Sequence, residues 1–131
     1  MTRFLLICFG GAVGTGARYL LGGVVAGLLG PEFPYGTLLI NVLGSLLIGV
    51  VQQVGLTTLA IPDTLRLVLT VGVMGGFTTY SSFSYETVKL VETGSWGAAS
   101  AYVLLTTALC LVGCVAGISV GRVLVEGKGG W

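Results

Sequence analysis

The stretch GGFTTYSSFSYE, residues 75–86, is the most informative part of this chain because it is polar inside an otherwise apolar segment. Two glycines precede ten residues, seven of which carry a hydroxyl group. A bilayer core accepts such a stretch only where protein or a water-filled cavity covers it. If the chain resumes a helix after the glycines, Tyr80 and Phe83 lie on one face of it. The stretch therefore indicates a functional segment within a membrane span.

The composition around this stretch is that of an integral membrane protein. Hydrophobic residues make up 54% of the 131 residues and charged residues 8%, whereas soluble domains carry about 25% charged residues. The mean hydropathy is +1.01. A net charge of +1 excludes the basic surface that a nucleic-acid-binding protein needs. With no histidine and five carboxylates, the chain has few groups for a buried metal site or an acid–base pair.

Four apolar segments predict four membrane-spanning helices in a single domain that covers residues 1–131. The segments are residues 4–29, 35–52, 65–90 and 98–125. Each approaches or exceeds the ~20 residues that a helix needs to cross a bilayer. Trp96 and Trp131 suit the membrane interface. Four spans place both termini on the same side of the membrane.

The distribution of Lys and Arg gives a weak orientation signal. Arg3, Arg66, Arg122 and Lys128 lie on the side of the termini, and Lys89 lies on the other side. This bias favours termini in the cytoplasm. It rests on so few charges that the chain could insert in both orientations.

Glycine is unusually frequent, with 23 of 131 residues against about 7% in an average chain. Small residues spaced by four let membrane helices pack closely. This spacing occurs at Gly10 and Gly14, Gly23 and Gly27, Gly72 and Gly76, and Gly113, Gly117 and Gly121. On the fourth span, Tyr102, Thr106 and Cys110 are also spaced by four, and their stripe overlaps the glycine face. That helix is expected to present a narrow polar strip to a close neighbour.

Three polar residues in the spans are open to a structural or a functional interpretation. Asn41 needs partners for its amide, which either an interhelical hydrogen bond or a ligand provides. Arg18 either extends to the interface or supplies positive potential at a pore mouth. Glu86 closes the polar stretch, where pairing with a cation or capping of the backbone is a structural explanation.

These residues together resemble the CrcB/Fluc family of small fluoride channels. The family pattern GGxTTFSTFSxE corresponds to residues 75–86, and GTLxxN corresponds to GTLLIN at residues 36–41. The family run GGxxGxxxR corresponds to GGAVGTGAR at residues 10–18, and the polar track of helix four to Tyr102, Thr106 and Cys110. The chain departs from the pattern at Tyr80, where phenylalanine is usual, and at Cys110, where serine is usual.

The resemblance implies an all-α membrane protein whose third helix is broken in mid-membrane. It implies that two copies insert in opposite orientations in a bacterial inner membrane as an antiparallel homodimer, with two narrow pores for passive fluoride export. A structural sodium ion at the dimer centre would be held by the backbone carbonyls of Gly75 and Thr78. The pore would be formed by Asn41, Phe83 and Tyr80, with hydroxyls from Thr79, Ser81, Ser82, Ser84 and Thr106, and with Tyr102 and Arg18 nearby.

Other classes fit these residues less well. A small proton-coupled carrier of the multidrug type needs a carboxylate in mid-membrane, and the first span contains Arg18 and no acid. A purely structural membrane subunit would explain the glycines but not the hydroxyl-rich stretch with its paired rings. A membrane enzyme is the least expected class, because no set of nucleophile and base is visible.

Overall fold

Helices dominate the computed structural model, which describes residues 1–58 and 61–127. The elements are α1 (Thr2–Leu29), α2 (Tyr35–Thr57), α3 (Asp63–Leu67), the π-helix η1 (Val68–Met74), α4 (Gly75–Phe77), α5 (Tyr80–Glu92) and α6 (Trp96–Glu126). The ends of the first, second and fourth predicted spans agree with α1, α2 and α6 to within a few residues. Lys128 and Trp131, used above for orientation and for the interface, lie outside the described residues.

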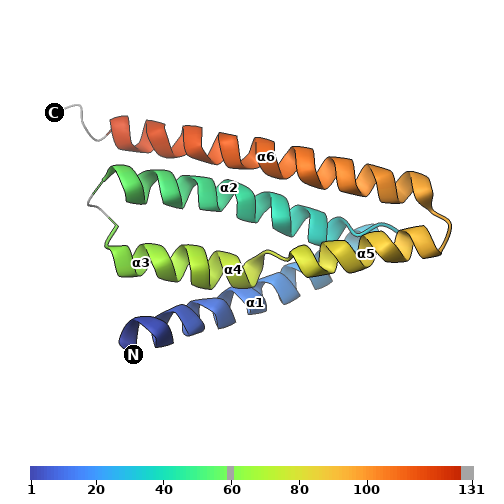
Figure 1. Cartoon of the computed structure of the whole chain (residues 1–131), viewed down its shortest axis with the longest axis horizontal. Helices are drawn as coiled ribbons and strands as arrows, with labels where there is room; N and C mark the ends of the chain where they lie inside the picture. Colours follow the sequence, from blue (N-terminus) through green and yellow to red (C-terminus); the bar gives the residue numbers. More distant parts are fainter. Residues whose placement is uncertain (59–60, 128–131) are drawn as a thin grey trace.

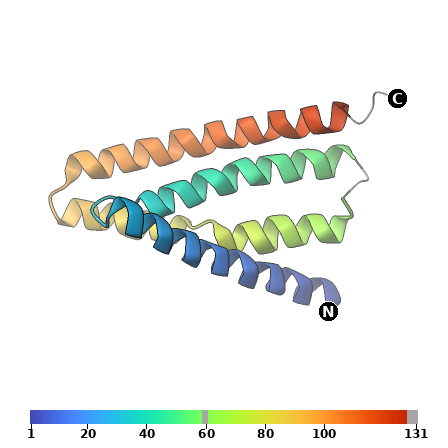
Figure 2. The same cartoon turned by 180° about the vertical axis from the view of Figure 1, so that it is seen from behind.

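The long helices lie along one bundle in which α1 runs opposite to α2 and α6, and the start of α1 and the end of α6 lie at the same end (Figure 1). The elements α3, η1, α4 and α5 follow one another along the same axis, between the two ends of the bundle. Seen from behind, α2 still lies beside α6, and α1 crosses the segment formed by η1 and α4 (Figure 2). The polar stretch therefore lies midway along the bundle, where it meets α1 and α2.

The bundle carries its apolar side chains on the outside. Among the described residues, α1, α2 and α6 are each long and apolar enough to cross a membrane. Bulky residues such as Leu104 and Val112 are exposed, whereas Gly113, Thr106 and Asn41 are buried. Large exposed apolar faces mark contact with lipid or protein rather than with water. The chain is therefore a multi-pass membrane protein.

Glycines form the closest contacts between helices. A Cβ atom added to Gly10 of α1 would lie 2.9 Å from the Val68 carbonyl oxygen, and one added to Gly72 would lie 2.7 Å from that of Ile7. Added Cβ atoms at Gly14, Gly76, Gly113, Gly117 and Gly121 would likewise meet atoms of the facing helix. The expected close packing is confirmed at these glycines. Gly23 and Gly27 differ, because an added Cβ atom there meets nothing within 4 Å in the described residues.

The connections follow from glycine and proline chemistry. Gly30 ends α1 with a φ of 82°, and Gly94 lies between α5 and α6 with a φ of 77°. Side chains with a Cβ atom rarely adopt this region, so glycine is favoured at both turns. Pro34 and Pro62 directly precede α2 and α3. Proline lacks a backbone N–H, which costs nothing at a helix start because that N–H would have no partner in the helix.

The π-helix η1 is a feature that the sequence does not predict. It spans Val68–Met74 and contains the buried Thr70 and Gly72. The wider turn of a π-helix is rare and occurs often at functional sites. Here it directly precedes Gly75, so the irregular backbone begins before the polar stretch does.

Candidate pore site

Thr78 and Thr79 interrupt the helical path between α4 and α5. Both residues are extended, with ψ values of 158° and 111°. Thr78 remains bound to the preceding turn, because its N–H and its Oγ1 both donate to the Met74 carbonyl at 2.9 Å. Thr79 caps the start of α5, where its Oγ1 accepts the N–H of Ser82 at 3.1 Å. Hydroxyl groups therefore complete the hydrogen bonding on both sides of the break.

Asn41 of α2 binds both main-chain groups of Thr79. Its Oδ1 accepts the Thr79 N–H at 2.8 Å, and its Nδ2 donates to the Thr79 carbonyl at 3.0 Å. Both residues are buried. The interhelical interpretation of Asn41 is thus confirmed. An amide nitrogen carries two hydrogens, so one N–H of Asn41 is still available to another group.

Most of the predicted site residues line one cavity of about 500 Å³, here called the central cavity. Its lining includes Asn41, Gly75, Thr78, Thr79, Tyr80, Phe83 and Thr106. Thr106 is only 7% exposed, and its Oγ1 is buried without a hydrogen-bond partner among the described residues. An unpaired buried hydroxyl is costly. We therefore expect the Thr106 hydroxyl to form a hydrogen bond with a ligand in the central cavity.

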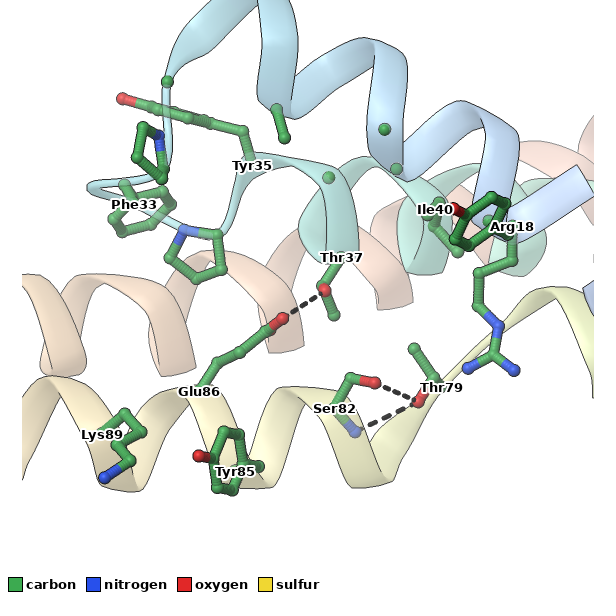
Figure 3. A pocket seen from close by; sticks show the side chains of 18 of the residues that line it. Arg18, Phe33, Tyr35, Thr37, Ile40, Thr79, Ser82, Tyr85, Glu86 and Lys89 are labelled. Atoms are coloured by element: carbon green, nitrogen blue, oxygen red, sulfur yellow. Dashed lines mark hydrogen bonds between the residues drawn. The ribbon is translucent and has the colours of Figure 1, made fainter.

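A second, larger cavity lies toward the end of the bundle where α1 meets α2, here called the outer cavity. Its lining includes Arg18, Thr37, Ser82 and Glu86, and Thr79 lines both cavities. In Figure 3 the Arg18 side chain extends from α1 toward Thr79 and Ser82. Within the described residues its guanidinium makes no hydrogen bond or ion pair, although Lys89 and the carboxylates of Glu32 and Glu86 line the same cavity.

Aromatic rings form a row between the two cavities. The ring centroids of Tyr80 and Phe83 are 5.5 Å apart, and those of Phe83 and Tyr102 are 5.1 Å apart. Both pairs are tilted, which turns ring edges toward neighbouring groups, and ring edges carry partial positive charge. Phe83 is 9% exposed and Tyr80 is 80% exposed in one copy of the chain.

Glu86 ties three helices together. Its carboxylate accepts the Thr37 hydroxyl at 2.8 Å and the Tyr102 hydroxyl at 2.7 Å, which joins α5 to α2 and α6. The first of these bonds crosses the outer cavity in Figure 3. Glu86 therefore has a structural role: its carboxylate holds α5, the helix that follows the break, against α2 and α6.

Three of the predicted site residues, Ser81, Ser84 and Tyr102, line neither cavity. The Ser81 hydroxyl lies 3.3 Å from the Thr79 hydroxyl. Ser84 donates its hydroxyl to the Tyr80 carbonyl at 2.9 Å, and Tyr102 is fully buried beside Glu86. Sequence reasoning also missed Thr37 and Ser45, which line the outer and the central cavity. The available signal was their spacing, because Thr37, Asn41 and Ser45 recur every four residues on α2 and share one face.

These features define a class: a small multi-pass membrane protein with polar cavities around an interrupted helix. The chain belongs to the CrcB-like protein family (Camphor Resistance, CrcB), whose model matches residues 5–118. The match confirms the family resemblance that residues 10–18, 36–41 and 75–86 indicate.

Several similar proteins carry the name "Fluoride-specific ion channel FluC". The one from Anaeromyxobacter sp. (strain K) is 54% identical over 116 residues, which cover 88% of this chain and 92% of that protein. The one from Geobacter sulfurreducens is 53% identical over 124 residues, covering 95% of this chain and 100% of that protein. The one from Sorangium cellulosum is 49% identical over 127 residues, covering 97% and 100%.

Proposed function

We propose that this chain is a subunit of a fluoride-selective passive channel that exports cytoplasmic fluoride down its electrochemical gradient. The observation that carries the proposal is the lining of the central cavity. It offers the unpaired Thr106 hydroxyl, one N–H of Asn41 and the Phe83 ring, and none of the described residues that line it is acidic. The full-length similarity to proteins named fluoride-specific ion channels supports the same conclusion.

The donors in this lining suit a small anion. Fluoride is strongly hydrated, so a dry path must replace its water with hydrogen-bond donors. Hydroxyls, an amide N–H and positive ring edges do this without a full positive charge. A fully charged lining would hold the ion too tightly for rapid exit. Arg18 would attract anions toward the outer cavity, because its guanidinium makes no ion pair among the described residues, while Glu32 and Glu86 lower the net charge there.

The proposed path joins the two cavities at the break. An anion would enter the outer cavity near Arg18, pass Ser82 and Thr79, and reach Phe83 and Thr106. Thr79 lines both cavities, and the Phe83 ring stands beside it on the first turn of α5. The carrier alternative requires a proton-binding carboxylate in mid-membrane, which the described lining of the central cavity does not supply.

We extend the proposal to the assembly. The segment of α3, η1, α4 and α5 would form a fourth, broken membrane span, and two copies would associate antiparallel in a bacterial inner membrane. The exposed Tyr80 ring and the weak charge bias support this arrangement. A second copy would cover the side of the central cavity on which Tyr80 lies.

The residues at the break fit a structural sodium ion. In a continuous helix the carbonyls of Gly75 and Thr78 would accept the N–H groups of Thr79 and Ser82. Those N–H groups bind Asn41 and the Thr79 hydroxyl instead. Unwound carbonyls of this kind coordinate sodium in other membrane proteins. The bound ion would supply a central positive charge between two copies.

One experiment tests the function. Purified protein is placed in liposomes loaded with fluoride, chloride or a lipophilic cation, and efflux is followed by electrode or tracer at clamped potential. We expect rapid efflux of fluoride, far slower efflux of chloride, and no need for a proton gradient. Protein-free liposomes give the leak. Cation exchange driven by a proton gradient would contradict the proposal and favour the carrier.

A further inference from the structure

We infer that Asn41 is a positioning residue for the cation site, because it keeps the Gly75 carbonyl free by binding the N–H that this carbonyl would otherwise accept. The inference rests on the proposed sodium site and goes beyond it. It gives the Asn41 side chain two roles. One N–H faces the proposed anion path, and the rest of the amide holds the backbone of the cation site.

The spacing of Gly75 and Thr79 shows which helical hydrogen bond is replaced. Thr79 lies four residues after Gly75, so its N–H is the partner that an uninterrupted helix gives to the Gly75 carbonyl. That N–H instead points to Asn41 Oδ1 at 2.8 Å. The return bond from Asn41 Nδ2 to the Thr79 carbonyl, at 3.0 Å, fixes the whole peptide group of Thr79 in this orientation.

The two ligand carbonyls are freed in different ways. The Thr78 carbonyl loses its partner to a local cap, since the Ser82 N–H binds the Thr79 hydroxyl of the same segment. The Gly75 carbonyl loses its partner to a side chain of another helix, α2. Only the Gly75 carbonyl therefore depends on Asn41, and the two contributions can be separated by mutation.

The burial of Asn41 and Thr79 determines how the backbone responds when the Asn41 amide is removed. Asn41 is 9% exposed and Thr79 is 7% exposed. A buried N–H that loses its acceptor is costly, and the acceptor that a continuous helix offers to the Thr79 N–H is the Gly75 carbonyl. An apolar residue at position 41 thus favours extension of α4 by that bond, which removes one cation ligand. An aspartate at position 41 still accepts the Thr79 N–H, so the Gly75 carbonyl stays free.

The test measures sodium binding through stability. Sodium that binds only the folded protein raises its melting temperature, so the sodium concentration giving half of that rise is measured in detergent, with N-methylglucamine as the balancing cation. The variants are Asn41→Leu, Asn41→Asp and, as matched control, Thr106→Val. Thr106 lines the same cavity but does not bond to the break.

We expect Asn41→Leu to need about tenfold more sodium than the parent, the effect of one lost favourable bond. Asn41→Asp should need no more sodium than the parent, because its carboxylate keeps the acceptor and adds a negative charge near the cation. Thr106→Val should respond to sodium as the parent does, and both variants should lose fluoride efflux. Should Asn41→Leu not fold, Asn41→Met is the second apolar variant, with a more adaptable side chain.

The possible results distinguish the positioning role of Asn41 from the proposed fluoride channel function. A parental sodium response in Asn41→Leu, or in Asn41→Met where the first variant does not fold, overturns the inference alone. An equal loss of the response in Asn41→Asp also overturns it, because that variant keeps the acceptor. A parent that does not respond to sodium overturns both the inference and the proposed cation site, while the liposome assay decides the channel function independently.

Discussion

Tyr80 carries the one ring of the predicted pore pair Tyr80 and Phe83 that is largely exposed. Its ring is 80% exposed, and its hydroxyl makes no hydrogen bond within the described residues. Asn41 and Ser84 make their hydrogen bonds to backbone, Asn41 to Thr79 and Ser84 to the Tyr80 carbonyl, and among the described residues neither bonds to the Tyr80 hydroxyl. The hydroxyl is therefore free to face an ion or a second copy.

Tyr80→Phe should raise the fluoride efflux rate. A phenol that donates to fluoride deepens a binding site and slows exit, and one hydrogen bond to an ion, about 1.5–3 kcal/mol, corresponds to roughly a tenfold to hundredfold rate effect. Selectivity against chloride should be unchanged, because the ring and its positive edge remain. Efflux from liposomes at clamped potential measures both quantities. An unchanged or lower rate in this variant shows that the hydroxyl is neutral or helpful.

Phe83→Ile should lower fluoride efflux by about tenfold or more, because it removes the ring edge from the path but keeps an apolar group of moderate size. The matched control is Phe9→Ile, at an exposed ring on α1 away from both cavities. Size-exclusion chromatography checks that both variants still assemble. If Phe83→Ile conducts like the parent, the pore does not run past this ring.

At the scale of the elements, glycine sets how closely helices approach. Gly14 and Gly16 lie two residues apart on α1 but meet different surroundings. A Cβ atom at Gly14 would collide with the Val73 carbonyl of η1, whereas one at Gly16 meets nothing within 4 Å in the described residues. The α1 contact with the interrupted segment therefore depends on one face of the helix.

Gly14→Ala should destabilise the protein by about 1–3 kcal/mol, the usual cost of forcing atoms into a packed interface. Gly16→Ala should be neutral or slightly stabilising, since alanine favours a helix over glycine. Thermal unfolding in detergent compares the two. Equal melting temperatures for both variants would mean that α1 moves away from η1 without cost.

The sequence predicts the long helices well because glycine and proline residues mark their ends. The first apolar run ends at Gly30, the second begins after Pro34, and the fourth begins after Gly94. These ends of α1, α2 and α6 could therefore be placed within a few residues. The π-helix could not be predicted, because Val68–Met74 is an ordinary apolar run with no residue pattern that marks a wider turn. The structure shows in addition that its Gly72 packs closely against Gly10 of α1.

The site could be predicted in part. The run at residues 75–86 indicated the rings and hydroxyls, of which Thr78, Thr79, Tyr80 and Phe83 line the central cavity. The bonds of Glu86 to Thr37 and Tyr102 could not be predicted, because they join three helices and no pattern along one helix reports them. Asn41 stayed open for another reason: an amide can bind a backbone and a ligand with different hydrogens.

For the whole molecule, few of the described charges report on orientation. Arg3, Arg66 and Arg122 lie toward the end with the start of α1, and Lys89 lies toward the other end. The excess of two cations at the first end favours that end in the cytoplasm, but so small an excess is a weak signal for the positive-inside rule. This weak signal underlies the proposed insertion in both orientations.

A single cysteine appended at the C-terminus should report two populations in native membranes. With Cys8, Cys110 and Cys114 replaced, a membrane-impermeant thiol reagent should label about half of the molecules in intact cells, because opposite insertions are expected in equal numbers. The remainder should react only after the membrane is opened. Labelling that is complete, or absent, in intact cells means a single orientation and contradicts the antiparallel dimer.

The hydroxyls of the interrupted segment also bear on how the chain is made. Thr70, Thr78, Ser84 and Thr87 each donate to the carbonyl four residues earlier, so their own helices conceal them from lipid. The peptide group of Thr79 is concealed only by Asn41. During synthesis α2 leaves the ribosome first, so the amide that Thr79 needs is already in the membrane when Thr79 arrives. The order of the helices along the chain thus protects the break from the first moment of insertion.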